Sequence, residues 1–177
     1  MNPLPVFSSM SKSWSRPSRR HLWVSALLSA GLLMAGCSTV EKINPFAGPA
    51  KLKGEIAAGA QLNPDVRKRA SPVVVRVFEL KANAQFESAD FVTLFEREQQ
   101  ALGPDLVARE EFVMRPGDKR TLDKKLSPDT RFIGVMVAFR ELERARWRAV
   151  IPVAVNRTNE VAISLDDIAV QATRTSP

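Results

Sequence analysis

The chain has 177 residues, with 26 basic and 19 acidic side chains, one histidine and one cysteine. Four of the basic residues and the histidine precede position 37, so the rest of the chain carries 22 basic and 19 acidic residues. This small surplus does not indicate nucleic-acid binding. Because this part has no histidine and one cysteine at most, Ser-His-Asp and Cys-His catalysis and zinc sites built from those residues are excluded.

The N-terminal segment has the order of an export signal. An apolar run from Leu22 to Cys37 follows a basic stretch without acidic residues, formed by Lys12, Arg16, Arg19 and Arg20. The run is shorter than the roughly 20 residues that span a membrane, which favours its removal after export. Ser18-Arg19-Arg20 weakly resembles a twin-arginine signal, so both export routes stay open.

The end of this run resembles the lipobox of bacterial lipoproteins, through Ala35-Gly36-Cys37. The resemblance implies a signal peptide over residues 1–36 and an acylated Cys37 as the mature N-terminus. Ser38 in place of Asp then indicates the periplasmic face of an outer membrane. The alternative is an ordinary secretory signal with a chance cysteine, which would leave an unusual free thiol.

Residues 37–50 are predicted to be a flexible tether, because Asn44-Pro45-Phe46 and Gly48-Pro49 break regular structure. Thirteen residues from Ser38 to Ala50 at about 3.3 to 3.6 Å each reach at most about 45 Å. A domain over residues 51–177 is therefore expected to be leashed to the membrane rather than embedded in it.

The domain begins with alternating apolar and polar residues from Lys51 to Leu62, which predict a half-buried strand. Two prolines and three consecutive basic residues then predict a long exposed loop from Asn63 to Pro72. Residues 72–80 form the strongest strand pattern in the chain, β-branched and nearly apolar on both faces. We expect this strand to lie in the interior of a sheet.

A short helical insertion is predicted at about residues 88–102. Ser88 is its expected N-cap and Asp90 lies in its first turn. Its apolar stripe contains Phe91, Leu94, Phe95 and Leu102, and Gly103-Pro104 ends it.

The second half of the chain alternates strand patterns with turn signals. Strands are expected at 106–114, at 119–126 as a lysine-rich edge strand, at 131–140 as a buried strand, and at 145–151, 161–165 and 168–170. Seven or eight short strands with one helical insertion predict an all-β fold, a two-sheet antiparallel sandwich.

Three groups of residues were weighed as sites. The arginines 144, 146 and 148 beside Trp147 suit either a nucleic-acid surface or a core tryptophan with a solvated strand face, and the second interpretation is favoured. Glu110-Glu111 and Asp166-Asp167 match no metal-loop spacing and are interpreted as surface carboxylates. The basic run 67–69 suits either contact with an acidic partner or simple solvation.

Taken together, several motifs resemble one family, the type VI secretion lipoproteins of the TssJ (SciN) family. The resemblance covers essentially the whole chain after residue 36 and rests on Leu62-Asn63-Pro64-Asp65, Ser71 to Leu80, Phe86, Ala89-Asp90-Phe91, Leu94, Leu102-Gly103, Arg115-Pro116-Gly117, Ile133-Gly134-Val135, Ala138-Phe139-Arg140 and Trp147-Arg148. It implies a transthyretin-like sandwich without catalysis or a cofactor, apart from the covalent lipid on Cys37.

The resemblance also implies partners and a site. The family binds the periplasmic C-terminal region of the inner-membrane protein TssM and, with TssL, completes a trans-envelope complex. The contact falls on the loop between the first two strands, here Asn63, Pro64, Asp65, Val66, Arg67, Lys68 and Arg69. No nucleic acid or small-molecule substrate is expected. The alternative is a periplasmic lipoprotein that binds a glycan or small ligand, for which an aromatic-lined cleft would be needed.

Overall fold

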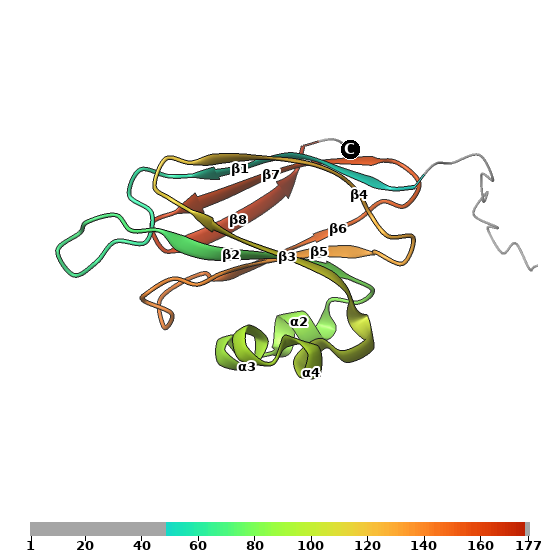
Figure 1. Ribbon diagram of the computed structural model, residues 1–177, viewed down its shortest axis with the longest axis horizontal. Helices are drawn as coiled ribbons and strands as arrows, with labels where there is room; N and C mark the ends of the chain where they lie inside the picture. Colours follow the sequence, from blue (N-terminus) through green and yellow to red (C-terminus); the bar gives the residue numbers. More distant parts are fainter. Residues whose placement is uncertain (1–48, 176–177) are drawn as a thin grey trace, which may run out of the picture. The chain divides into compact units, whose positions relative to one another are not determined.

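The computed structural model describes residues 49–175, which form two four-stranded sheets packed face to face (Figure 1). The first sheet contains, in spatial order, β4 (Lys119–Lys125), β1 (Lys51–Ala58), β7 (Thr158–Asp166) and β8 (Ala169–Arg174). The second contains β3 (Leu106–Met114), β2 (Val73–Leu80), β5 (Phe132–Val137) and β6 (Arg148–Pro152). The predicted two-sheet sandwich is confirmed. Cys37 and the residues before it lie outside the described part.

One strand pair departs from the antiparallel pattern. β1 runs parallel to β7, with Lys51 opposite Thr158, whereas the other pairs within the sheets are antiparallel. Gly54 permits this pairing, because it has a φ of 149° and a Cβ there would lie 1.8 Å from the carbonyl oxygen of Val161. The β1 strand is also shorter than predicted, since the chain turns after Ala58.

The strand predicted to be interior, β2, lies between β3 and β5. One face of β2 contributes valines 73, 75 and 77 to the core between the sheets. The other face places Phe78 and Leu80 in a second core, beneath the helices. Burial on both faces explains why this strand is apolar throughout.

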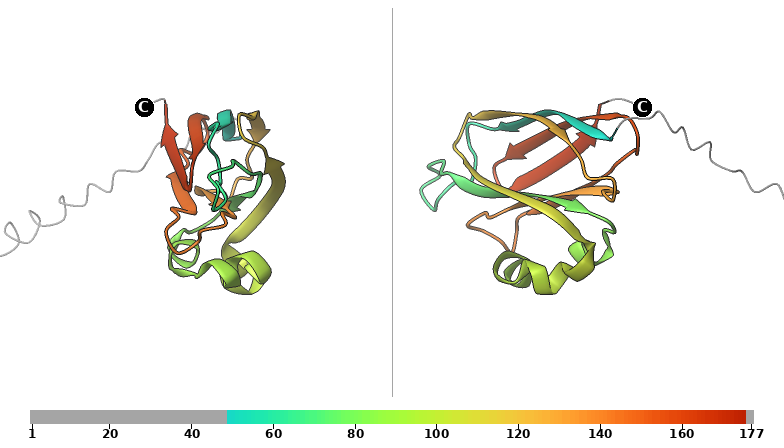
Figure 2. Two further views of the ribbon diagram at one scale, coloured as in Figure 1. Left: turned by 90° about the vertical axis from the view of Figure 1, so that its left-hand side faces the viewer. Right: turned by 45° about the vertical axis from the view of Figure 1, so that its right-hand side comes forward.

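The helical insertion begins earlier than the sequence indicated and is not one helix. It consists of α2 (Ala84–Ser88), α3 (Phe91–Glu96), α4 (Glu98–Leu102) and a 3-10 turn, η1 (Gly103–Asp105). Asp90, not Ser88, caps a helix, since its side chain accepts a hydrogen bond of 2.9 Å from the Thr93 N–H. Figure 2 shows the helices gathered on one side of the sandwich.

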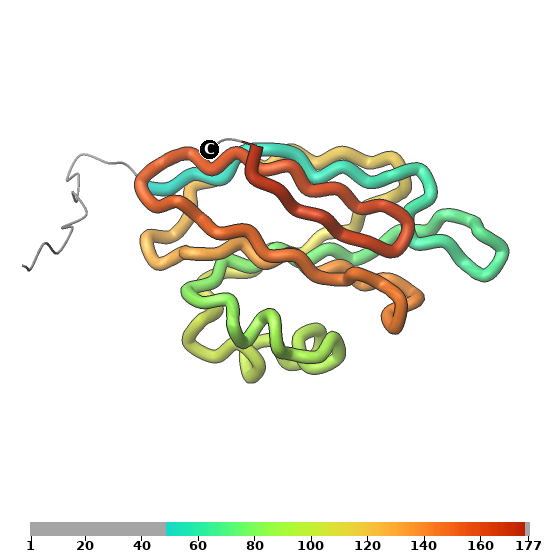
Figure 3. The backbone as a smooth tube through the Cα atoms, turned by 180° about the vertical axis from the view of Figure 1, so that it is seen from behind, coloured from blue at the N-terminus to red at the C-terminus, as the bar shows by residue number. Residues whose placement is uncertain are grey.

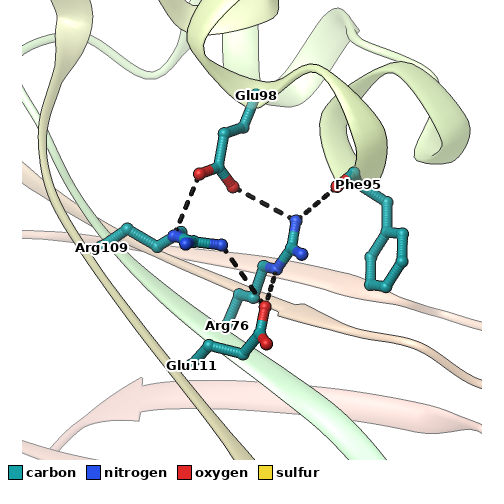
Figure 4. A network of polar contacts seen from close by, with 5 residues as sticks. All are labelled: Arg76, Phe95, Glu98, Arg109 and Glu111. Carbon is teal, nitrogen blue, oxygen red and sulfur yellow. Dashed lines mark hydrogen bonds and ion pairs between the residues drawn. The ribbon is translucent and has the colours of Figure 1, made fainter.

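Two features fix the insertion to the second sheet. Phe86 is fully buried over Gly134, where a Cβ would approach its ring to 2.9 Å. Arg76 of β2 reaches out of the sheet to the carbonyl oxygen of Phe95, at 2.6 Å, and to Glu98, at 3.2 Å (Figure 4). None of the helices in residues 49–175 is long and apolar enough to cross a membrane.

The two ends of the sandwich carry different loops. At one end, called the distal end, lie the loops 59–72, 115–118, 138–147 and the 167–168 turn. At the other, called the proximal end, lie the first residue of β1 and the loops 126–131 and 153–157. Figures 1 and 3 show loop 59–72 projecting from the distal end.

Candidate functional site

Loop 59–72 joins β1 of the first sheet to β2 of the second, and its base is closed by hydrogen bonds. The Ser71 N–H donates to the carbonyl oxygen of Leu62 at 2.9 Å, and the Asn63 N–H donates to that of Asp167 at 2.6 Å. Leu62 is fully buried in the core between the sheets. The two ends of the loop therefore leave the sandwich side by side.

Asn63 holds the loop to its neighbours from inside. Its side chain is buried, accepts a hydrogen bond of 2.8 Å from the Arg140 N–H and donates one of 3.0 Å to the carbonyl oxygen of Pro72. Its φ of 50° is a left-handed conformation that asparagine tolerates better than most residues. Asn63 thus supports the loop, and its side chain does not form part of the loop's outer surface.

Asp65 organises the tip of the loop. Its Oδ1 accepts hydrogen bonds from the N–H groups of Arg67 and Arg69, at 2.8 and 2.9 Å. Its Oδ2 accepts one from the Arg69 Nε at 2.7 Å. These bonds, led by those from the Arg69 backbone and side chain, hold the pKa of Asp65 below its usual range. Lys68, at a φ of 58°, completes the turn by donating its N–H to the Asp65 carbonyl oxygen at 2.7 Å.

This arrangement leaves three side chains free to meet a partner. Val66 is 99% exposed, which is unusual for a branched apolar residue. Arg67 and Lys68 are exposed and form no ion pair with residues 49–175, whereas Arg69 is already paired with Asp65. Of the three consecutive basic residues, two therefore keep an uncompensated charge.

A second loop contributes to the same surface. A hollow of about 410 Å³ lies between loop 59–72, Glu141 and Arg144 of the 138–147 loop, and the 167–168 turn. A second hollow of about 420 Å³ has Arg140 and Glu141 in its wall, together with Val66. No sequence pattern indicated this contribution, since residues 141–144 look like an ordinary polar connection and only the topology brings them to the loop.

The other candidate groups have structural roles. Trp147 packs edge-on against Phe91, with ring centroids 5.3 Å apart. Arg148 lies over the Trp147 ring and donates to the carbonyl oxygens of Phe86 and Ala89, at 3.1 and 2.7 Å. The tryptophan was predicted to be a core residue, but Arg148 fastens the insertion and is not on a solvated face.

The carboxylates of Glu110 and Glu111 take part in ion pairs with arginines of the same sandwich. Glu111 is paired with Arg76 and Arg109, and Glu110 with Arg120 at 2.6 Å. Within residues 49–175 no group of three or more potential metal ligands gathers. The two hollows at the distal end, and one of about 310 Å³ at the proximal end, have no aromatic residue in their lining, so they lack the feature that the ligand-binding alternative needs.

The fold and the loop together define a small β-sandwich with a helical insertion on one face and a clamped basic loop at one end. The chain belongs to the family described as "Type VI secretion lipoprotein, VasD, EvfM, TssJ", whose model matches residues 50–168. The family predicted from the sequence motifs is thereby confirmed. It is a family of membrane-bound structural lipoproteins of type VI secretion and is not known as an enzyme family.

Solved structures agree with this membership. The type VI lipoprotein TssJ1 from Pseudomonas aeruginosa is 35% identical, with a TM-score of 0.71, over 73% of this chain and 99% of that one. Serratia marcescens Lip, a membrane-bound component of the type VI secretion system, shares the fold at 22% identity, with a TM-score of 0.64, over 70% of this chain and 96% of that one.

A third match comes from a structure described as the TssM C-terminal domain (869–1107) from EAEC. The matching chain is 25% identical, with a TM-score of 0.59, over 69% of this chain and 99% of that one. No curated protein matches the sequence significantly.

Proposed function

We propose that this protein is a non-catalytic adaptor of the type VI membrane complex. A lipid on Cys37 holds it at the periplasmic face of the outer membrane, and loop 59–72 binds the periplasmic C-terminal region of TssM. Through TssM and TssL, the adaptor connects the outer membrane to the inner-membrane part of the machine. The observation that carries this proposal is the clamped loop that exposes Val66, Arg67 and Lys68. The similar chain in a structure named for the TssM C-terminal domain supports the choice of partner.

The direction of β1 suits this role. A tether from Cys37 enters the sandwich at Lys51, and the eight residues of β1 then run to the base of the loop. At about 3.3 Å per residue, the strand separates the tether from the loop by roughly 25 Å. The partner surface therefore lies at the end of the domain farthest from its membrane attachment.

The hydrogen bonds of the loop suit a binding surface as well. A flexible loop must be ordered when it binds, which costs about 0.5 to 1.5 kcal/mol for each immobilised side chain. Asn63 and Asp65 fix the loop backbone before any partner arrives. Val66 can then bury apolar surface, while Arg67 and Lys68 steer an acidic or mixed surface into register.

Calorimetric titration of residues 38–177 into the periplasmic domain of the TssM encoded nearest to this protein tests the loop. We expect the double reversal Arg67→Glu and Lys68→Glu to weaken binding by about tenfold or more, with an unchanged circular dichroism spectrum and melting temperature. The control is the double reversal Lys51→Glu and Lys125→Glu, which changes the net charge equally at the proximal end. Equal affinities of the wild type and the loop variant would remove the loop from the mechanism.

The anchor is tested separately. Cys37→Ser is expected to prevent acylation, so that the domain is released into the periplasm and secretion stops. The measurements are membrane fractionation and the amount of a secreted type VI component in the medium. Secretion at the normal level from this variant would contradict the anchoring role.

A further inference from the structure

The proximal end carries a group of basic side chains that loop 59–72 and the proposed partner do not use. Lys51, Lys125, Arg131 and Arg157 are exposed there, and none is ion-paired with a carboxylate in the described part of the chain. We call these four residues the proximal basic surface. An acidic neighbour, Asp129, is already paired with Lys81 at 3.3 Å.

Two of these residues face each other across a pair of neighbouring strands. Lys51 of β1 lies directly opposite Lys125 of β4, and both are on the outer face of the first sheet. Like charges in opposed positions destabilise a sheet. Two residues further along β1, Lys53 lies opposite Asp123 on one side and Glu160 on the other. Lys53 thus has an acidic residue opposite it on both neighbouring strands, whereas Lys51 and Lys125, at the end of the sheet, lie opposite each other.

The distal end differs in charge. There, Arg67, Lys68, Arg140 and Arg144 are accompanied by exposed carboxylates from Glu141, Glu143, Asp166 and Asp167. A mixed surface of this kind suits docking to a protein with its own pattern of charges. Of the carboxylates near the proximal end, Asp129 is paired with Lys81, and Asp123 and Glu160 lie opposite Lys53. The proximal end therefore keeps a net positive charge, which suits an anionic partner.

We propose that the proximal basic surface binds the anionic phospholipid headgroups of the membrane that carries the anchor. This inference rests on the proposed acylation of Cys37 for its location, because the tether enters at Lys51, beside Lys125 and Arg157. A tether of at most about 45 Å keeps this end at an effective concentration in the millimolar range near the membrane. Basic side chains are attracted to anionic lipid only within about a Debye length, roughly 8 Å at physiological salt. Contact with the membrane then orients the domain with loop 59–72 facing away from it.

Vesicle binding by residues 38–177, which lack the cysteine and therefore any lipid, tests the surface alone. These residues contain both hydrophobic cores of the described part, and the solved TssJ1 chain aligns over 99% of its length with 73% of this chain. The probe is a set of vesicles of phosphatidylcholine with about 30% phosphatidylglycerol, compared with pure phosphatidylcholine, in co-sedimentation at low and physiological salt. We expect at least about tenfold stronger partitioning into the anionic vesicles, weakened by salt.

Two matched variants decide whether the location of the charge matters. Lys51→Glu with Lys125→Glu is expected to reduce partitioning into anionic vesicles by about tenfold or more. Arg67→Glu with Lys68→Glu alters the net charge equally and is expected to change it by less than about threefold, since those residues lie at the distal end. Equal losses in the two variants, or no preference of the wild type for phosphatidylglycerol, would overturn the proposal.

A single substitution separates lipid binding from stability. Lys125→Glu places opposite charges across the β1–β4 pair, so its melting temperature is expected to match or exceed that of the wild type while vesicle binding falls. Retained vesicle binding by this stable variant would count against the surface. Because Lys51→Glu with Lys125→Glu is expected to keep its affinity for the TssM domain, loss of partner binding in the loop variant and loss of lipid binding here are independent results.

Discussion

Arg76 is one of the residues that attach the helical insertion to the second sheet, and removing its buried guanidinium tests how much that contact contributes. Arg76 lies on β2 with its side chain 10% exposed and contacts Glu111, Glu98 and the carbonyl oxygen of Phe95 (Figure 4). Its guanidinium also lies 4.2 Å from the centroid of the Phe95 ring. Arg76→Met keeps an unbranched aliphatic side chain at this position and removes the charge, its hydrogen bonds and its contact with the ring.

The expected loss of stability follows from the carboxylates and the carbonyl oxygen that lose Arg76 as a partner. Hydrogen bonds to charged groups contribute about 1.5 to 3 kcal/mol each, and removing one member of a buried ion pair costs about 3 to 5 kcal/mol. Arg109 remains beside both carboxylates, at 3.0 Å from Glu98 and 3.3 Å from Glu111, and partly compensates for the loss. We therefore expect the free energy of unfolding to fall by about 2 to 4 kcal/mol.

Arg109→Met is the matched control, because it touches the same two carboxylates. Its side chain is 38% exposed, so solvent screens its ion pairs and the expected cost is about 0 to 1 kcal/mol. Urea unfolding followed by the fluorescence of Trp147, the one tryptophan after residue 36, measures both variants. If Arg76→Met costs no more than Arg109→Met, burial does not set the strength of this network and the reasoning is wrong.

Three further predictions concern other parts of the sandwich. Gly134→Ala brings a Cβ to 2.9 Å from the Phe86 ring, so it is expected to lower the free energy of unfolding by about 1 to 3 kcal/mol. Adding Phe86→Leu to the same chain should recover part of that loss in urea unfolding. Additive losses from the two substitutions would contradict the steric explanation. Asn63→Ala leaves two part-buried backbone groups, the Pro72 carbonyl and the Arg140 N–H, without their side-chain partner. It is expected to cost about 1 to 3 kcal/mol and to weaken TssM binding, whereas unchanged stability would show that the clamp is dispensable. Burial alone raises the pKa of Glu79, but hydrogen bonds from Lys124, Thr130 and Ser127 outweigh it and lower the pKa below its ordinary value. A lowered folded-state pKa adds stability that is present above the ordinary pKa and is lost as pH falls through the folded value. The stability difference between wild type and Glu79→Gln should therefore shrink between about pH 7 and pH 3. A constant difference would refute this prediction.

The strands were predictable because their patterns reflect burial. Residues 73–80 are apolar on both faces since one face meets the first sheet and the other meets the helices. The two exceptions in this strand, Arg76 and Glu79, looked anomalous in the sequence. Each is explained by partners distant along the chain, Glu98 and Glu111 for Arg76, and Lys124 for Glu79. Such pairings leave no local pattern.

The site was only partly predictable for a similar reason. Prolines and charges marked residues 63–72 as a loop, but no local pattern indicated that Asn63 would be buried. Its partners, the carbonyl of Pro72 and the N–H of Arg140, meet it only because β1 and β5 end, and β2 begins, at the same end of the sandwich. The parallel pairing of β1 with β7 was missed because alternation shows which face is buried and not which strand is the neighbour.

The hydrogen bonds that fix loop 59–72 lower the conformational entropy that the loop loses when it binds a partner. Under the proposed anchoring at Cys37, a tether over residues 37–50 would let the domain move by up to about 45 Å from its attachment point and so search for its partner. A second flexible element at the contact itself would add an ordering cost to each binding event. Asp65 and Asn63 lower that cost by fixing the loop to the sandwich. If the proximal basic surface binds lipid as proposed, the domain would in addition present this ordered loop away from the membrane, so that neither the loop conformation nor the orientation of the domain has to be found when the partner arrives.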